Sequence, residues 1–176
     1  MSDIDKTAIQ ADDSKPPLIG VMFVCFGNIC RSPSAEGIFR SLVIEAGLEQ
    51  YIFIDSTGTA AINIGKSPDP RAIVACDSVG IDIRGLVARQ IDDDDYRRCQ
   101  YIVAMDRQNL LNVTAWQTKD YAGDISLLMQ HHPHNGGNHQ LPDPYNSGQE
   151  TFYRVVESIT IACQSLLKKI RSDHNL

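Results

Sequence analysis

The sequence predicts a single α/β domain, in which the strands of an open parallel sheet alternate with helices. Apolar runs of strand length alternate with segments whose apolar residues recur at helical spacing, and this order favours right-handed crossovers between parallel strands. The first run, residues 18–25, is apolar throughout, as in strands that helices cover on both faces. A length of 176 residues fits one domain of this kind.

The first strand leads through a short loop into a helix. Ser32 suits the N-cap of this helix and Pro33 its first position, and the helix is expected to end before Gly47. Residues 51–55 are expected to form the second strand. Because ligands bind at the carboxyl ends of the strands in such sheets, the loop after Cys25 lies where a ligand is expected.

The rest of the chain repeats the alternation. A helix opens at Ser67 and runs to about residue 79, and the acidic run Asp92–Asp95 is expected at the N-terminus of another helix. The other expected elements are a third strand at 100–105, a helix at 106–113, a fourth strand at 125–129 and a final helix at 151–170.

Composition restricts the function classes. Hydrophobic residues make up 43% of the chain and charged residues 22%, which is typical of a globular protein rather than a disordered one. The net charge of −6 argues against general binding to nucleic acid or to anionic membranes, so any anionic ligand needs a local site. Residues 1–17 are polar, and we expect them to form a flexible N-terminal tail ahead of a domain at 18–176.

We expect a cytoplasmic protein without a membrane span. The first residues lack the pattern of an export signal, and the longest apolar run, Leu18–Phe26, is about half the length that a bilayer requires. The five cysteines are odd in number and unevenly spread, which fits neither a disulfide framework nor a zinc site. Three of them, Cys76, Cys99 and Cys163, are expected to be core residues in helices.

The most informative segment is Cys25-Phe-Gly-Asn-Ile-Cys-Arg-Ser32, which we call the phosphate loop. A loop that wraps onto a helix N-terminus points several backbone N–H groups at one place and so binds a tetrahedral oxyanion. Gly27 permits a backbone conformation or a close approach that a side chain would hinder. The planar guanidinium of Arg31 fits two oxygens of the anion.

Two further groups of the phosphate loop point to nucleophilic chemistry. The amide dipoles and Arg31 favour the thiolate form of Cys25, and the Ser32 hydroxyl is placed to donate to that sulfur. This combination suggests a covalent phosphocysteine intermediate. The spacing Cys-x5-Arg is weak by itself, since Cys25 could be a core thiol and Arg31 a surface charge. The apolar strand before the loop and the Ser-Pro helix start after it favour the functional interpretation.

A histidine-rich segment contains His131, His132, His134 and His139. A metal site there is conceivable. The Gly-Gly pair and the proline within it favour a solvated loop instead, and no carboxylate or cysteine has ligand spacing. We therefore expect neither a metal nor another cofactor.

Five segments of the chain form a recognisable set: Val24–Glu36, Gly65–Arg71, Ala88–Gln90, Met105-Asp106 with Asn109, and Asp143-Pro-Tyr145. In these segments the chain resembles the low-molecular-weight protein tyrosine phosphatases, and the similarity covers about residues 18–170. The resemblance implies a three-layer, Rossmann-like fold with a four-stranded parallel sheet flanked by helices and the phosphate loop after the first strand. It also implies a metal-free hydrolysis of phosphotyrosine.

The resemblance also indicates an acid. Expulsion of a phenolate oxygen requires a proton, which a carboxylic acid on a loop over the phosphate supplies before it activates water in the second step. Asp143 matches the family acid, and the prolines on either side stiffen its loop. Asp-Pro alone is a common turn. Asp69 also precedes a proline, but it opens a helix that the family uses structurally.

Three side chains match family positions that line the phosphotyrosine ring, namely Phe26, Ile62 and Tyr145. Ile62 is the aliphatic alternative of many bacterial members, and Asn146 replaces the second tyrosine of the eukaryotic Asp-Pro-Tyr-Tyr. Both differences bear on substrate preference rather than on the chemistry.

Other matched positions concern the phosphate loop itself. Asn28 is expected to hydrogen-bond across the loop with help from Ser56, whereas Leu86 stands where the family has a histidine, which removes one support. Cys30 is expected to condense with an oxidised Cys25 and so protect it, unless it merely packs. The residues expected to bind the phosphate are Phe26, Gly27, Asn28, Ile29, Cys30, Arg31 and Ser32.

Three alternatives share this scaffold or its loop. Thioredoxin-linked arsenate reductases need two further redox cysteines in a short segment, and Cys76 and Cys99 are 23 residues apart. Protein arginine phosphatases have threonine in place of Ile29, and the isoleucine favours phosphotyrosine. A non-catalytic phosphotyrosine-binding module is disfavoured because nucleophile, arginine and acid are all present. The expected partner is a phosphotyrosine protein, with a tyrosine kinase as one candidate, and the oligomeric state is open.

Overall fold

The computed structural model describes residues 18–176, so the tail predicted at 1–17 lies outside the described residues. Four parallel strands form a sheet in the order β2-β1-β3-β4. They are β1 (Ile19–Cys25), β2 (Ile52–Gly58), β3 (Tyr101–Ala104) and β4 (Asp124–Leu127). The predicted fold class is confirmed, and each predicted strand is present.

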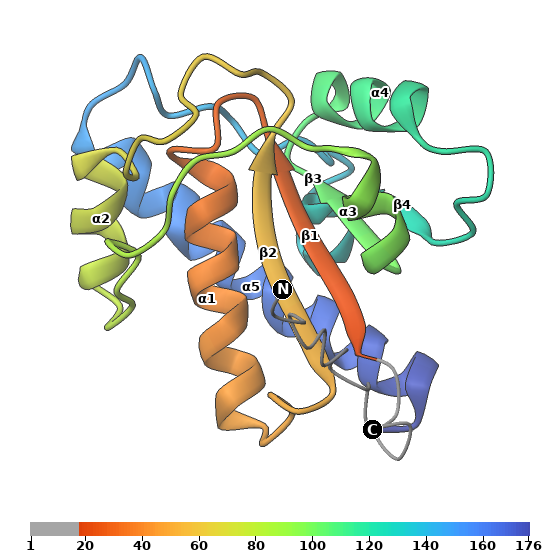
Figure 1. Ribbon diagram of the computed structural model, residues 1–176. Coiled ribbons are helices and arrows are strands. Elements are labelled where there is room, and N and C mark those ends of the chain that lie inside the picture. Colours follow the sequence, from red (N-terminus) through yellow and green to blue (C-terminus); the bar gives the residue numbers. More distant parts are fainter. Residues whose placement is uncertain (1–17) are drawn as a thin grey trace, which may run out of the picture.

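Helices cover both faces of the sheet (Figure 1). α1 (Arg31–Glu45), α2 (Pro70–Asp77) and the long α5 (Gln149–His174) share one core cluster, and α3 (Asp93–Arg98) and α4 (Arg107–Trp116) contribute to a second. Side chains of a strand alternate between the two faces. The three layers therefore explain why β1 is apolar throughout, because Val21 and Phe23 pack into the first cluster while Met22 and Val24 pack into the second.

The first helix begins earlier than its predicted start at Pro33. α1 starts at Arg31, and Ser32 lies inside its first turn instead of forming the N-cap. The Ser32 hydroxyl lies 3.1 Å from the carbonyl oxygen of Thr57, at the end of β2, and 3.0 Å from Cys25 Sγ. The side chain is thus engaged across the sheet edge and does not cap its own helix.

Two other boundaries differ from the predictions. α2 begins at Pro70 rather than at Ser67, because the Asp69 carboxylate accepts a hydrogen bond from the N–H of Arg71 and caps the helix there. The fourth strand ends at Leu127, and the buried apolar residues after it form a 3-10 helix, η1 (Leu128–His131). An apolar run does not distinguish a strand from a buried helical turn, since both hide the same side chains.

The acidic run forms the predicted helix start. Asp92 caps α3 and forms a capping box with Asp95. Cys99 directly follows α3 and does not lie within a helix, but all five cysteines are buried and free. Among the helices of residues 18–176, none combines the length and the apolar character that a membrane span needs.

The ends of three strands meet at one edge of the sheet, where the phosphate loop lies (Figure 1). Cys25, the last residue of β1, pairs with Gly58, the last residue of β2. A Cβ at Gly58 would lie 2.7 Å from the carbonyl oxygen of Phe26, so glycine allows β2 to pass against the phosphate loop. Asp106 follows β3 at the same edge and caps α4 by accepting from the N–H of Asn109.

Candidate active site

One cleft contains the predicted nucleophile, arginine and acid. Its volume is about 310 Å³, and the phosphate loop forms its base. The cleft is lined by Cys25, Phe26, Gly27, Ile29, Cys30, Arg31, Ile62, Asn63, Asp143, Tyr145 and Asn146. The fold thus brings the two ends of the domain to one place, because the loop after β1 meets the segment before α5.

The sulfur of Cys25 is surrounded by hydrogen-bond donors. Cys25 is buried, and the backbone N–H of Asn28 donates to its Sγ at 3.2 Å. The Ser32 hydroxyl lies 3.0 Å from the same sulfur. Ser32 has one hydrogen to donate and two acceptors in reach, Cys25 Sγ and the carbonyl oxygen of Thr57. The site therefore offers the sulfur a donor that strengthens when the sulfur becomes negative.

Asn28 connects the phosphate loop to its surroundings. Its backbone lies in the left-handed region, at φ 53°, which asparagine tolerates better than most residues. Its side-chain amide donates to Ser32 Oγ at 2.9 Å and to Ser56 Oγ at 3.0 Å. Its Oδ1 accepts from the backbone N–H of Arg89 at 2.9 Å. The side chain is buried with its polar groups bonded, so the loop conformation is strongly determined.

The polar network continues beneath the loop to a buried carboxyl. The Ser56 hydroxyl donates to Glu36 Oε2 at 2.7 Å, and Arg40 donates to Glu36 Oε1 at 2.7 Å. Burial raises the pKa of Glu36 above its ordinary value of 4.5. Glu36 is not among the predicted site residues, although it lies one helical turn after Ser32 on α1.

Arg31 is held by two carboxylates. Its side chain is only 2% exposed, and its Nη1 and Nη2 lie 2.7 Å from Asp106 Oδ2 and Asp143 Oδ2, respectively. Nη1 also donates to the carbonyl oxygen of Leu141 at 3.1 Å. A buried guanidinium requires such partners, since desolvation without them is costly. Asp143 is 47% exposed and Asp106 22%, so Asp143 is the carboxylate nearer to solvent.

The predicted wall residues form the rim of the cleft. Phe26, Ile62 and Tyr145 are about half exposed or more and line the same cleft, and such a grouping of exposed apolar side chains is typical of a ligand-binding groove. Gly27 serves a close approach, because a Cβ there would lie 2.6 Å from Nδ2 of Asn63. That amide donates to the carbonyl oxygen of Gly27 at 3.2 Å, so Asn63 joins the cleft wall to the phosphate loop.

Cys30 and Leu86, two other residues singled out in the sequence, are packed among other residues. Cys30 lines the cleft but is buried, and desolvation raises the pKa of its thiol well above the ordinary range. Leu86, in place of the family histidine, packs against the main core. A support from the same segment comes instead from the backbone of Arg89, whose N–H reaches Asn28.

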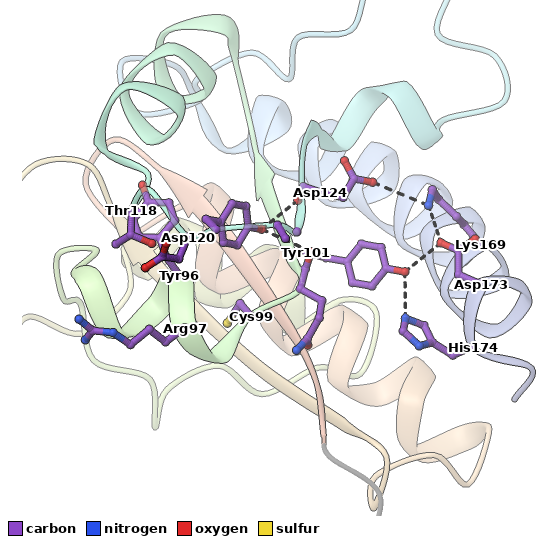
Figure 2. Close-up of a pocket in the computed structure, with 14 residues that line it drawn as sticks. Tyr96, Arg97, Cys99, Tyr101, Thr118, Asp120, Asp124, Lys169, Asp173 and His174 are labelled. Carbon is purple, nitrogen blue, oxygen red and sulfur yellow. Dashed lines mark hydrogen bonds and ion pairs between the residues drawn. The ribbon is translucent and has the colours of Figure 1, made fainter.

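A larger cavity, of about 890 Å³, lies at the amino ends of β3 and β4 (Figure 2). Several of its polar groups are bonded to one another. The Tyr101 hydroxyl donates to Asp173 Oδ2 at 2.8 Å, and Lys169 Nζ lies 3.7 Å from Asp124 Oδ2. None of the residues predicted to carry chemistry lines it, so the smaller cleft is the candidate active site.

The histidine-rich segment stays apart from the cleft lining. His139 Nδ1 lies 3.0 Å from Asn135 Nδ2, and His131 Nε2 lies 3.4 Å from Ser126 Oγ. Within residues 18–176, no group of three or more His, Cys, Asp or Glu side chains has the arrangement of metal ligands.

Three residues near the cleft were missed as functional candidates. Asp106 comes directly after the third strand, so its place at the ligand-binding edge of the sheet was a usable signal. Arg71 closes the matched segment Gly65–Arg71 but was given no role, and Asn63 was not singled out, because their contacts join segments that are distant in sequence.

The fold and the cleft define an α/β protein with an anion-binding loop, a cysteine at its base and a buried arginine beside it. Comparison with known proteins gives the family. The model of the family "low molecular weight phosphotyrosine protein phosphatase" matches residues 20–176. The chain belongs to this family.

Relatives are similar along almost their whole length. The low molecular weight phosphotyrosine protein phosphatase of Sus scrofa is 39% identical over 155 residues, with 86% of this chain and 95% of the relative covered. A crystal structure of a protein tyrosine phosphatase from Entamoeba histolytica superposes with a TM-score of 0.83 at 28% identity, covering 89% of this chain and 99% of that one. A Drosophila arginine phosphatase superposes with a TM-score of 0.80 at 31% identity, covering 87% and 98%.

Proposed function

We propose that this protein hydrolyses phosphotyrosine in proteins, with Cys25 as the nucleophile, Arg31 and the phosphate-loop amides as the phosphate site, and Asp143 as the general acid and base. The observation that carries the proposal is that Cys25, Arg31 and Asp143 line one cleft of about 310 Å³. The aromatic and aliphatic rim of Phe26, Ile62 and Tyr145 suits a phenyl ring above the phosphate.

The first step transfers the phosphoryl group to sulfur. The Cys25 thiolate attacks phosphorus, an S–P bond forms, and the bond from phosphorus to the tyrosine oxygen breaks. The phenolate takes a proton from the carboxyl group of Asp143 and leaves as tyrosine. Arg31 binds two phosphate oxygens in this step, while Asp106 stays paired with Nη1 of the guanidinium and orients it.

The second step releases phosphate. Asp143, now a carboxylate, takes a proton from water, the water oxygen attacks phosphorus, and the S–P bond breaks. The sulfur leaves as a thiolate, which the Ser32 hydroxyl and the Asn28 N–H stabilise by donating to it.

A phosphoarginine phosphatase is the second candidate, favoured by the similarity to the Drosophila arginine phosphatase. Ile29 lines the cleft at the position where arginine phosphatases have threonine, and it supports the phosphotyrosine assignment. The physiological partner that we propose is a cytoplasmic phosphotyrosine protein, with a tyrosine kinase among the candidates.

One experiment tests the proposal against the phosphoarginine candidate. Matched peptides that carry phosphotyrosine, phosphoserine or phosphoarginine are incubated with the protein, with reductant and chelator present, and released phosphate is measured. Turnover of the phosphotyrosine peptide alone is expected. Preferred turnover of phosphoarginine would favour the second candidate, and no turnover of any peptide would contradict the proposal. Cys25→Ser should abolish turnover and retain binding of the phosphotyrosine peptide.

We also propose that Cys30 protects Cys25 from irreversible oxidation. Hydrogen peroxide converts the Cys25 thiolate to a sulfenic acid, and the Cys30 thiol then displaces water and forms a Cys25–Cys30 disulfide. Cys25 and Cys30 line the same cleft, which supports the reaction, and burial raises the pKa of the Cys30 thiol, so its attack is expected to be slow. Peroxide-treated Cys30→Ser should fail to recover activity with dithiothreitol, whereas the wild-type protein should recover. Equal recovery would contradict this role.

A further inference from the structure

Arg71 has an unusual set of contacts for a residue outside the cleft lining. It lies at the start of α2, yet its side chain reaches a segment that precedes α5. Residues 141–147, which we call the acid loop, contain Asp143 and Tyr145. The contacts of Arg71 connect the phosphate loop to the acid loop.

The connection starts at the phosphate loop. The backbone N–H of Asp69 donates to the carbonyl oxygen of Ile29 at 2.7 Å, which fixes Asp69 against the phosphate loop. Asp69 in turn binds Arg71 with both carboxylate oxygens, at 3.0 Å from Nε and 2.7 Å from Nη2. This two-point ion pair orients the plane of the guanidinium. It also lowers the pKa of Asp69, so the pair stays charged at neutral pH.

The connection ends in the acid loop. Arg71 Nη1 donates to the carbonyl oxygen of Ser147 at 3.0 Å, and the guanidinium carbon lies 5.7 Å from the centre of the Tyr145 ring. The guanidinium carbon also lies 4.6 Å from the centre of the Phe152 ring, which is buried. The backbone carbonyl of Arg71 accepts from Gln149 Nε2 at 2.9 Å.

Two arginines therefore hold opposite ends of the acid loop. Arg31 binds Leu141 and Asp143 near its start, and Arg71 binds Ser147 at its end and faces Tyr145. An incoming phosphate group competes with Asp143 for Arg31, so the contact at the start weakens when substrate binds. The contact at the end involves no group that binds phosphate and persists through the reaction.

We propose that Arg71 is a positioning residue for the reaction: it holds the acid loop over the phosphate loop, so that Asp143 and Tyr145 keep their places when phosphate takes over Arg31. This inference rests on the proposed function. In this proposal Arg71 supports proton transfer by Asp143 and the contact of Tyr145 with the substrate ring. It does not contribute to phosphate binding.

The test compares Arg71→Met with Arg71→Lys and with the control Arg84→Met. Methionine keeps an unbranched side chain about as long as the aliphatic part of arginine, but it has no side-chain hydrogen-bond donor and no charge. Lysine keeps the charge but cannot bind Asp69 and Ser147 with a planar fork. Arg84 pairs with Asp77 and Asp82 and contacts neither loop, so its replacement controls for the lost charge.

Three readouts separate positioning from a merely structural role. The first is kcat/KM for phenyl phosphate, whose leaving group needs a proton, and for p-nitrophenyl phosphate, whose leaving group needs it less. For Arg71→Met we expect a loss of roughly 10-fold or more on phenyl phosphate, since a displacement of about 1 Å can have such an effect, and a smaller loss on p-nitrophenyl phosphate. Arg71→Lys should lie between Arg71→Met and the wild type.

The second readout is the inhibition constant of inorganic phosphate, which should not rise because Cys25 and Arg31 are intact. The third is hydrogen exchange of the acid-loop amides, which should become faster in Arg71→Met while the β1 amides stay protected. Arg84→Met should match the wild type in all three.

Equal losses on both substrates together with weaker phosphate inhibition would overturn the proposal, since Arg71 would then support the whole fold. Kinetics and exchange like those of Arg84→Met would overturn it as well. If the wild-type protein turns over neither substrate, the proposed function fails. The exchange measurement still decides in that case whether Arg71 holds the acid loop, because it does not depend on activity.

Discussion

Arg31 Nη2 lies 2.7 Å from Asp143 Oδ2, so the proposed phosphate-binding arginine is paired with the proposed acid. In the proposed mechanism, phosphate and Asp143 compete for the same guanidinium. A phosphate dianion that binds Arg31 takes the place of the Asp143 carboxylate there. The pairing would thus couple the binding of substrate to the release of the proposed acid from Arg31.

Asp143→Asn separates the two roles of this carboxylate. We expect kcat/KM for a phosphotyrosine peptide to fall roughly 100-fold, a magnitude typical of a lost general acid, and kcat/KM for p-nitrophenyl phosphate to fall less. Inorganic phosphate should bind at least as tightly as in the wild type, because its competitor for Arg31 is gone. Steady-state kinetics with both substrates and phosphate as inhibitor measure this. Equal losses on both substrates would argue against Asp143 as the acid.

Asp106→Asn should weaken phosphate binding. Asparagine retains the capacity to cap α4, but it no longer balances the charge of the buried Arg31. A hydrogen bond to a charged group contributes about 1.5–3 kcal/mol, so we expect the inhibition constant of phosphate to rise roughly 10-fold. The melting temperature should fall by a few degrees because the buried Arg31 loses the charge of one partner, and a single cooperative unfolding transition distinguishes this variant from a misfolded one. Unchanged phosphate inhibition would show that Asp106 does not orient Arg31.

Two substitutions of Asn28 separate the effect of its backbone conformation from the effect of its side-chain hydrogen bonds. Both Asn28→Gly and Asn28→Ala remove the amide that bonds Ser32 and Ser56, and both should lower kcat/KM. Alanine additionally resists the left-handed backbone at φ 53°, so its free energy of unfolding should be lower than that of the glycine variant by about 1 kcal/mol or more. Urea denaturation of the two variants measures the difference. Equal stabilities would mean that the loop relaxes away from the left-handed conformation.

Glu36→Gln tests the buried carboxyl beneath the phosphate loop. Because burial raises the pKa of Glu36 above 4.5, the folded protein binds this proton more tightly than the unfolded chain does. Its contribution to stability is therefore fully present below the unfolded pKa and is lost as pH rises through the folded pKa.

Glutamine does not ionise, so its variant does not lose stability in this way as the pH rises. The free energy of unfolding of Glu36→Gln relative to the wild type should therefore increase between about pH 4 and pH 7. Urea denaturation at several pH values gives the two curves. A difference that stays constant, or that shrinks with pH, would contradict the raised pKa. Arg40 donates to Glu36 from a half-exposed position, and its pairing opposes the effect of burial without cancelling it.

Much of the fold follows from local patterns. The continuous apolar run at β1 reflects burial on both faces, and the capping residues before α3 act through contacts with near neighbours in sequence. Local patterns were less reliable where two structures bury the same residues. Leu128 and Met129 extend an apolar run and were predicted as strand, but they form η1. Ser32 has the chemistry of an N-cap, but its hydroxyl is engaged by Thr57 and Cys25.

By itself the sequence determined the α/β class, the position of the phosphate loop after the first strand, and Cys25, Arg31 and Asp143 as the residues to examine. These follow from periodicity, from short-range chemistry and from motif resemblance. Only the tertiary structure decided that Asp106 and Asp143 both pair with Arg31. It also decided that Ser56 links Asn28 to the buried Glu36 by hydrogen bonds, and that Arg71 connects the phosphate loop to the acid loop. The physical reason is that such contacts depend on how the strand ends converge and on the direction of each side chain, which no local pattern encodes.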